Sequence, residues 1–210
     1  QTNQYYQILK QADGYVPLVF GLSVKNQLKA ILLVTLMKEQ GIKGFFSSRG
    51  VVFGGPVLSN DITEEELGFF LNQVVLQMRG KAIYLETRNF FDYSDHRQAF
   101  INAGWVYKPY LNFQLSLKNV SKESILKKFK YNRRREIKQS ISEGVTYGLC
   151  ANEKEVDEVY YILHDLYKTK VKLPLPSLSY FLNLYHKNIA KVFIVKHNGK
   201  TIGGSICPVL

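Results

Sequence analysis

The chain has 210 residues, 46% of them apolar and 21% charged, a composition typical of a folded globular protein and not of a disordered tail. Its formal net charge of +11 favours an anionic partner such as nucleic acid, a nucleotide diphosphate or an acidic membrane surface. We find no apolar run long enough for a membrane span and no secretory leader, and therefore expect a cytoplasmic protein that can still touch a membrane surface.

The cysteines and histidines predict no metal site. Cys150 and Cys207 lie far apart without a CxxC neighbour, which indicates reduced thiols in a core. The four histidines are scattered without metal-ligand spacing, so we expect no metal. We also expect no bound cofactor.

In the first half of the chain, short strands alternate with helices, which favours an α/β architecture with a mixed sheet. A T-x-x-E capping box at Thr63 begins a helix whose apolar positions share one face: Leu67, Phe70, Leu71, Val74 and Met78. Two further helices are predicted over residues 3–12 and 95–103. Strands are predicted over residues 16–24, 28–37, 41–46, 82–88 and 105–117. A glycine-rich loop is predicted over residues 47–56.

The segment from Lys118 to Val145 is the most basic stretch of the sequence. Between Val120 and Gly144, eight Lys/Arg stand against three Asp/Glu. At 100° per residue an apolar stripe forms with a cationic flank: the stripe is Leu126, Phe129, Ile137 and Ile141, with Arg133 inside it, and the flank is Lys127, Arg134 and Lys138. Such a flank can hold a phosphate or carboxylate, although most charge runs are solvated faces. A break at Tyr131-Asn132 into two shorter helices stays open.

The second half repeats part of the first. A strand over 145–150 and a helical stripe from Val156 to Tyr167 lead to a turn over 168–176 and a helix over 178–185. A hairpin of strands 192–197 and 202–209 then crosses Asn198-Gly199-Lys200. In each half a helix is thus followed by a strand, a turn and a second strand.

This repetition predicts a shortened duplication. The turn at Asn26 lies 91 residues before Leu117 (117 − 26), whereas the turn at Gly199 lies 11 residues before Leu210 (210 − 199). We expect about 80 residues of the second copy to be missing (91 − 11). The predicted organisation is a first domain over 1–117 that lacks its start, a linking helix or helix pair over 118–144, and a truncated second domain over 145–210.

The order of these motifs resembles the FemABX family, bacterial aminoacyl transferases built from two domains of the GNAT, or acetyltransferase-like, fold. The match is carried by Arg134-x-x-Ile137-Lys138-Gln139-Ser140 followed by Gly144-Val145, and by residues 190–204 at the second hairpin. Weaker similarities lie at Arg49-Gly50 and at residues 107–112. Gln139-Ser140 departs from the usual Lys-Ala of the family.

The resemblance implies a GNAT-like fold and transfer of an aminoacyl or acyl group onto an amine acceptor, one candidate being the peptide of a peptidoglycan precursor used in cell-wall synthesis. The donor is then aminoacyl-tRNA, with acyl-CoA as the alternative, and the acceptor is a small or lipid-linked molecule with anionic groups. Attack by an amine needs positioning and stabilisation of the oxyanion more than a nucleophilic side chain. A non-enzymatic RNA-binding module that uses the basic segment is the other alternative.

We expect the substrate-binding residues in four places, with the acceptor bound by the first domain near the basic segment; no catalytic residue is assigned. Arg49 and Gly50 lie in the glycine-rich loop before the capped helix, where backbone N–H groups suit a diphosphate, although a glycine-rich turn with a solvated arginine is as good an interpretation. Arg88 and Asn89 end a strand, where open α/β sheets place ligands. Tyr110 and Asn112 could line a peptide groove or serve a core or turn role. Arg134 and Lys138 lie on the basic segment, where a salt bridge is the competing role for Arg134.

Overall fold

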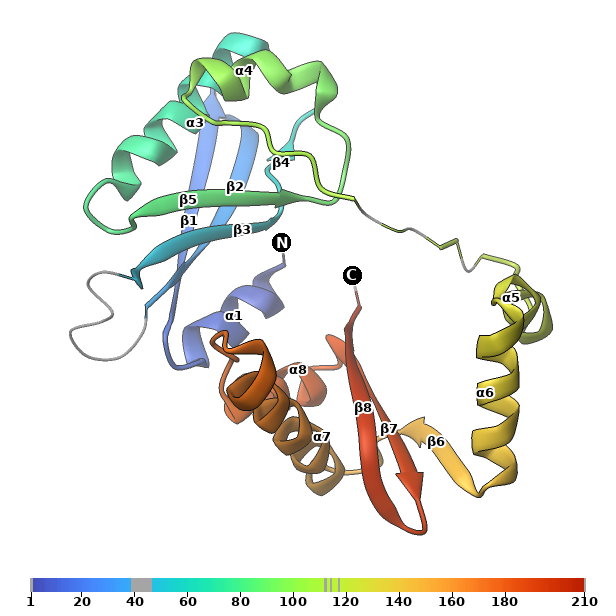
Figure 1. The fold of residues 1–210 in the computed structure, drawn as a ribbon. Helices are drawn as coiled ribbons and strands as arrows, with labels where there is room; N and C mark the ends of the chain where they lie inside the picture. The colour runs from blue at the N-terminus through green and yellow to red at the C-terminus, as the bar shows by residue number, and fades with distance from the viewer. Residues whose placement is uncertain (1, 39–46, 112, 114, 117, 210) are drawn as a thin grey trace. The chain divides into compact units, whose positions relative to one another are not determined.

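The computed structural model describes residues 2–38, 47–111, 113, 115–116 and 118–209. The chain folds as two compact units, Gln1–Lys108 and Pro109–Leu210, which Figure 1 shows in blue to green and in yellow to red. The division follows Lys108, whereas the sequence predicted the end of the first domain at Leu117. The strand predicted over residues 41–46, and also Asn112, lie outside the described residues.

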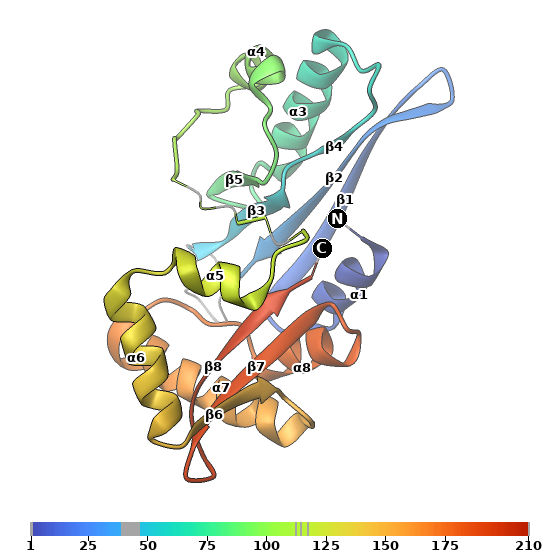
Figure 2. The same cartoon turned by 90° about the vertical axis from the view of Figure 1, so that its right-hand side faces the viewer.

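The first unit is a mixed sheet with helices on both sides (Figures 1 and 2). Its elements are α1 (Asn3–Gln11), β1 (Tyr15–Val24), β2 (Gln27–Met37), β3 (Arg49–Gly54), β4 (Val57–Leu58), α3 (Glu64–Met78), β5 (Tyr84–Asn89), the 3₁₀ turn η1 (Ser94–His96) and α4 (Arg97–Asn102). The strand order is β1-β2-β3-β5, and β4 also pairs with β2. β3 and β5 run parallel, and the other pairs are antiparallel.

The central strand β2 is buried on both faces, which explains its nearly continuous apolar sequence. Leu32, Val34 and Leu36 belong to the cluster formed with α3. The predicted face of α3 is confirmed, since its buried residues are Leu67, Phe70, Leu71, Val74 and Met78. Each such buried side chain stabilises the fold by about 1.5–3 kcal/mol, so this face fixes α3 on the sheet.

Two local predictions, one in this unit and one across its boundary with the next, are wrong. Residues 49–54 form the strand β3 and not part of a loop. No strand forms over the described residues between Trp105 and Ser116, and the side chain of Tyr110 is 87% exposed. A strand needs a hydrogen-bonded neighbour as well as an alternating pattern, and no strand in the described part of the chain pairs with the outer edge of β5.

The second unit is a three-stranded antiparallel sheet, order β6-β7-β8, with α7 and α8 behind it in Figure 2. Its elements are α5 (Lys122–Lys128), α6 (Tyr131–Ser142), β6 (Val145–Leu149), α7 (Glu153–Leu166), the π-helical turn η2 (Tyr167–Val171), α8 (Leu178–His186), β7 (Ala190–His197) and β8 (Lys200–Pro208). Val156 and Val159 of α7 pack against Val192 and Ile194 of β7 around Cys150. Cys207 is only partly buried, so it is not the core residue that the sequence predicted.

The basic segment is a pair of helices, because the backbone is extended at Phe129 and Lys130. Neither helix buries a residue, so no packing against the core stabilises a single uninterrupted helix. Polar contacts join both to the sheet of the second unit. Lys122 Nζ donates to Tyr147 Oη at 2.7 Å, and His197 Nε2 lies 3.1 Å from the carbonyl of Glu143.

The two hairpins share one geometry. β1 and β2 turn through Lys25-Asn26, and β7 and β8 turn through Asn198-Gly199, with positive φ at all four residues, as tight two-residue turns need. Each hairpin also has a β-bulge at the third residue of its second strand, which has no partner in the ladder. The bulged residue is Lys29 in the first hairpin and Ile202 in the second. The two hairpins therefore share their turn conformation and the position of the bulge, and the duplication itself stays a prediction.

No helix in the described part of the chain is both long enough and apolar enough to cross a bilayer.

Candidate functional site

The parallel strands β3 and β5 end side by side, with Gly54 opposite Asn89. They are connected through α3, and ligands of open α/β sheets bind beyond the carboxyl ends of such strands. We call residues 53–56 and 88–93, at this end of the strand pair, the carboxyl edge. It is the part of the first unit that this rule selects as a candidate site.

The turn after β3 fits closely against the segment after β5. Gly55 has φ +79°, and a Cβ atom there would lie 2.7 Å from both Asn89 Oδ1 and Tyr93 Oη. Tyr93 Oη donates to the carbonyl oxygen of Pro56 at 2.7 Å. Asn89 Oδ1 accepts from Thr87 Oγ1 at 2.8 Å. These contacts hold the two segments together and fix the Asn89 amide.

Arg88 supplies the positive charge of the carboxyl edge. Its guanidinium lies 5.6 Å from the centre of the Phe53 ring, and its Nε donates to Glu86 Oε1. The Arg88 side chain is about half exposed, so its remaining N–H groups can reach a ligand. Phe91, 73% exposed, adds apolar surface to the same edge. Asp92 adds a carboxylate to the same edge, and its hydrogen bonds from Ser94 lower its pKa. The arrangement can contact one anionic group through Arg88 and an apolar part through Phe91.

Tyr93 acts on this edge as a positioning residue. Burial raises the pKa of its phenol, and the protonated hydroxyl donates to the Pro56 carbonyl. Its ring packs edge-on to Phe100 at 6.1 Å, and Phe100 packs on Trp105 at 6.0 Å. The aromatic chain connects the edge to the core of the first unit.

Arg49 and Gly50 do not lie at this edge. Arg49 is opposite Tyr84 at the other end of the strand pair, roughly 16 Å from Gly54 at 3.3 Å per residue. Gly50 is buried, and a Cβ there would meet Leu85 Cδ1 at 2.7 Å. Gly50 therefore serves close packing, and its predicted role toward a diphosphate gains no support.

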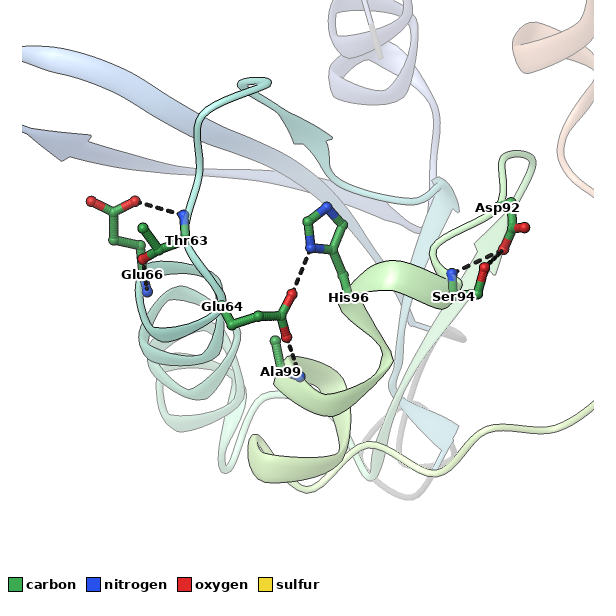
Figure 3. A network of polar contacts seen from close by, with 7 residues as sticks. All are labelled: Thr63, Glu64, Glu66, Asp92, Ser94, His96 and Ala99. Carbon is green, nitrogen blue, oxygen red and sulfur yellow. Dashed lines mark hydrogen bonds and ion pairs between the residues drawn. The ribbon is translucent and has the colours of Figure 1, made fainter.

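The start of α3 is occupied by the chain's own carboxylates, as Figure 3 shows. Thr63 Oγ1 accepts from the Glu66 N–H at 3.2 Å, and Glu66 Oε2 accepts from the Thr63 N–H at 3.0 Å. Glu64 accepts from the Ala99 N–H at 3.0 Å and contacts His96 Nδ1 at 2.7 Å. Because three glutamates fill the first turn, this helix start disfavours the diphosphate that the sequence predicted near it.

The remaining predicted residues lie in the second unit. Tyr110 is exposed and Asn112 is not described. Arg134 and Lys138 are one turn apart on α6, with Arg134 partly buried and Lys138 exposed. The structure thus groups Arg88 with Asn89, and Arg134 with Lys138.

Sequence reasoning did not select Gly55 and Tyr93. Consecutive glycines before Pro56 were a signal for a tight turn, but nothing local marks Tyr93, whose partner lies 37 positions earlier. Among the described residues, no group of three or more His, Cys, Asp or Glu side chains could hold a metal ion.

The architecture is the mixed α/β, GNAT-like fold that the sequence predicted, and its resemblance to FemABX proteins is confirmed at the level of the fold. A crystal structure of FemX superposes with a TM-score of 0.58 at 15% sequence identity, over 93% of this chain and 52% of that one. The chain therefore spans about half the length of FemX.

Two further solved structures are similar. One is a probable acetyltransferase, with a TM-score of 0.36 at 8% identity over 54% of this chain and 74% of that one. The other is the C-terminal domain of a putative lysylphosphatidylglycerol synthetase from Agrobacterium fabrum, with a TM-score of 0.45 at 15% identity over 98% of this chain and 59% of that one. Both scores are below 0.5, so the FemX likeness alone bears on the fold. No family model and no curated protein matches the sequence.

Proposed function

We propose that this protein is an acyltransferase of the FemX kind, which moves an aminoacyl or acyl group onto an amine, and that its carboxyl edge binds the acceptor. The observation that carries the proposal is the FemX-like fold over 93% of the chain. In the first unit of this fold a parallel strand pair ends in a fixed edge where Arg88 offers one cationic contact.

The reaction needs no nucleophile from the protein. The acceptor nitrogen attacks the carbonyl carbon of an ester or thioester, a C–N bond forms, and the C–O or C–S bond breaks. The amine loses one proton and the leaving oxygen or sulfur gains one, so acyl donor and amine give amide and free alcohol or thiol. The protein contributes positioning and stabilisation of the oxyanion.

Arg88 is the residue that we assign to the anionic part of the acceptor. Its charge lies at the strand ends, next to the fixed Asn89 amide and the exposed Phe91 ring. A peptidoglycan precursor peptide, with its carboxylates and its amine, has the matching chemistry. Arg49, at the opposite end of β3, stands as the competing assignment.

The activity is tested with the complete gene product, supplied with charged tRNA or acyl-CoA and a peptidoglycan precursor that carries a free amine. Mass spectrometry of the acceptor should show one added aminoacyl or acyl group with one of the two donors. Absence of an amide product with both donors, in a protein that is folded by circular dichroism, would refute the transferase.

The acceptor site is tested by binding alone. Arg88→Ala should weaken precursor binding about 10- to 100-fold, the range for loss of a hydrogen bond to a charged group. Arg79→Ala, which removes an exposed arginine at the end of α3, is the matched control and should leave the affinity unchanged. If Arg49→Ala abolishes binding and Arg88→Ala does not, the assignment of the acceptor to the carboxyl edge fails.

A second function is favoured by one observation, the exposure of the cations on α5 and α6. The exposed ones are Lys122, Lys127, Lys128, Arg133, Arg135 and Lys138, and Lys130 between the helices is exposed as well. An RNA-binding module would use them on phosphates. tRNA affinity should then fall steeply with salt, by a slope of about 0.9 or less per phosphate contact on a log–log plot. Steep salt dependence without acyl transfer would favour this module over the transferase.

A further inference from the structure

The segment between α7 and α8 presents lysines and aliphatic side chains together on the surface of the second unit. We name it the Lys–Leu turn, residues 166–173. Its exposed members are Leu166, Lys168, Thr169, Lys170, Val171, Lys172 and Leu173. None of them belongs to the candidate sites described above.

The turn has a defined backbone. α7 ends at Leu166 and passes into the π-helical turn η2, which is closed by a 2.7 Å hydrogen bond from the Lys172 N–H to the Tyr167 carbonyl. Thr169 Oγ1 donates to the Asp165 carbonyl at 2.7 Å. Lys172 has φ +55°, a left-handed conformation that lysine rarely adopts. The side chains are therefore displayed from a strained and fixed turn.

Apolar surface is left in water at this turn. Leu173 is 62% exposed, Leu166 41% and Val171 39%, although the core of the unit lies directly beneath α7. Three lysines alternate with these side chains, against one acidic residue, Asp165, in residues 162–175. Aliphatic groups interleaved with lysines suit the boundary of an anionic bilayer, where the chains enter the interface and the ammonium groups meet lipid phosphates.

From this surface we infer that the Lys–Leu turn docks the protein peripherally onto an anionic lipid membrane. Nucleic acid fits the turn less well, because residues 162–176 contain no arginine and the exposed apolar side chains of the turn are aliphatic. Binding of single-stranded nucleic acid relies on aromatic stacking. The inference is independent of the proposed transferase activity.

The charge is tested by co-sedimentation with phosphatidylcholine vesicles, with and without phosphatidylglycerol. Wild type should bind only the mixed vesicles. The variant Lys168→Gln/Lys170→Gln/Lys172→Gln should bind on the order of 100-fold more weakly, at about fivefold per lysine near an anionic surface. The matched control, Lys127→Gln/Lys128→Gln/Lys130→Gln, removes the same charge from α5 and its flank and should change binding less than about fivefold, the effect of one lysine.

The apolar part is tested by fluorescence. Leu173→Trp should be quenched by lipids brominated in their acyl chains, whereas Ile202→Trp, at an exposed apolar position of β8, should not. Slow labelling of the buried Cys150 thiol would show that each variant is folded. Three results would overturn the inference: no binding to the mixed vesicles, a larger loss in the α5 control than in the turn variant, or tRNA binding that requires the three turn lysines.

Discussion

The hydroxyl of Tyr93 and the main-chain carbonyl of Pro56 form a 2.7 Å hydrogen bond that joins the segments following the two parallel strands. The same hydroxyl lies 3.3 Å from the Gly54 carbonyl. One phenol thus orders both sides of the carboxyl edge. The edge is the proposed acceptor site. The Tyr93 hydroxyl therefore affects both the geometry of that site and the stability of the first unit.

Tyr93→Phe should lower the free energy of unfolding of the first unit by about 1 kcal/mol, since it leaves the partly buried Pro56 carbonyl without this donor. Trp105, the single tryptophan of the chain, reports on this unit in urea titrations. Tyr84→Phe, at an exposed position of β5, is the control and should stay within about 0.5 kcal/mol of wild type. Equal effects of the two changes would contradict the role of Tyr93.

Gly55→Ala should destabilise the first unit more than Gly80→Ala does. Both glycines have positive φ, +79° and +73°, so both variants carry a backbone penalty of about 1–2 kcal/mol. At Gly80 an added Cβ meets nothing within 4 Å, whereas at Gly55 it meets Asn89 and Tyr93 at 2.7 Å. The overpacking should add about 1–3 kcal/mol. The difference between the urea midpoints of the two variants measures this added destabilisation. Similar midpoints would show that Asn89 and Tyr93 can move away from the added Cβ atom.

The second unit should lose stability in acid through Glu155. Its hydrogen bond with Lys196, at 2.6 Å, lowers the pKa of Glu155 and raises that of Lys196. Glu155 contributes its full stabilising free energy above the pKa that it has in the unfolded chain, near 4.5. This stabilisation is lost as the pH falls through the lower pKa that it has in the folded protein. The contribution of Lys196 is full below 10.5 and is lost as the pH rises through its higher folded pKa.

Hydrogen exchange of peptides from β6 and β7, followed from pH 7 toward pH 3 after correction for intrinsic rates, should show this acid loss in wild type. Glu155→Gln should flatten the pH dependence. Asp165→Asn, which removes an exposed carboxylate of the same helix and leaves the Glu155–Lys196 pair intact, should preserve it. An unchanged slope in Glu155→Gln would show that the pair does not control acid stability.

The two thiols should react at very different rates. Burial, and to a smaller extent the charge of Glu155, raises the pKa of Cys150 to about 11, so little thiolate is present at neutral pH. Cys207 is partly exposed at the end of β8. A thiol reagent at pH 7.5 should modify Cys207 first and Cys150 only as the second unit opens. Peptide mapping distinguishes the two, and rapid labelling of Cys150 would contradict its burial.

The sequence alone determined the elements whose signals are local. The capping box at Thr63 and the 3.6-residue apolar period placed α3 and its buried face, and short polar turns placed both hairpins. The order of these motifs was enough to suggest the GNAT-like fold. Arg88 and Asn89 were correctly placed at the end of a strand, because the end of β5 is visible in the sequence. Each of these signals depends on neighbours within about one helical turn or one tight turn, which is the range that propensity and periodicity cover.

Tertiary structure alone decided what depends on distant partners. Arg49-Gly50 looked like a loop because glycine-rich sequences lack side-chain signals, yet β3 forms there because it pairs with both β2 and β5. Gly50 leaves the room that Leu85 and Met78 occupy. The alternation after Trp105 did not become a strand, since no ladder partner is present among the described residues. Tyr93 acquired its role from Pro56, 37 positions away. Local conformational preferences determine which helices and strands form. Long-range contacts determine which residues lie next to one another, and the candidate site consists of such contacts.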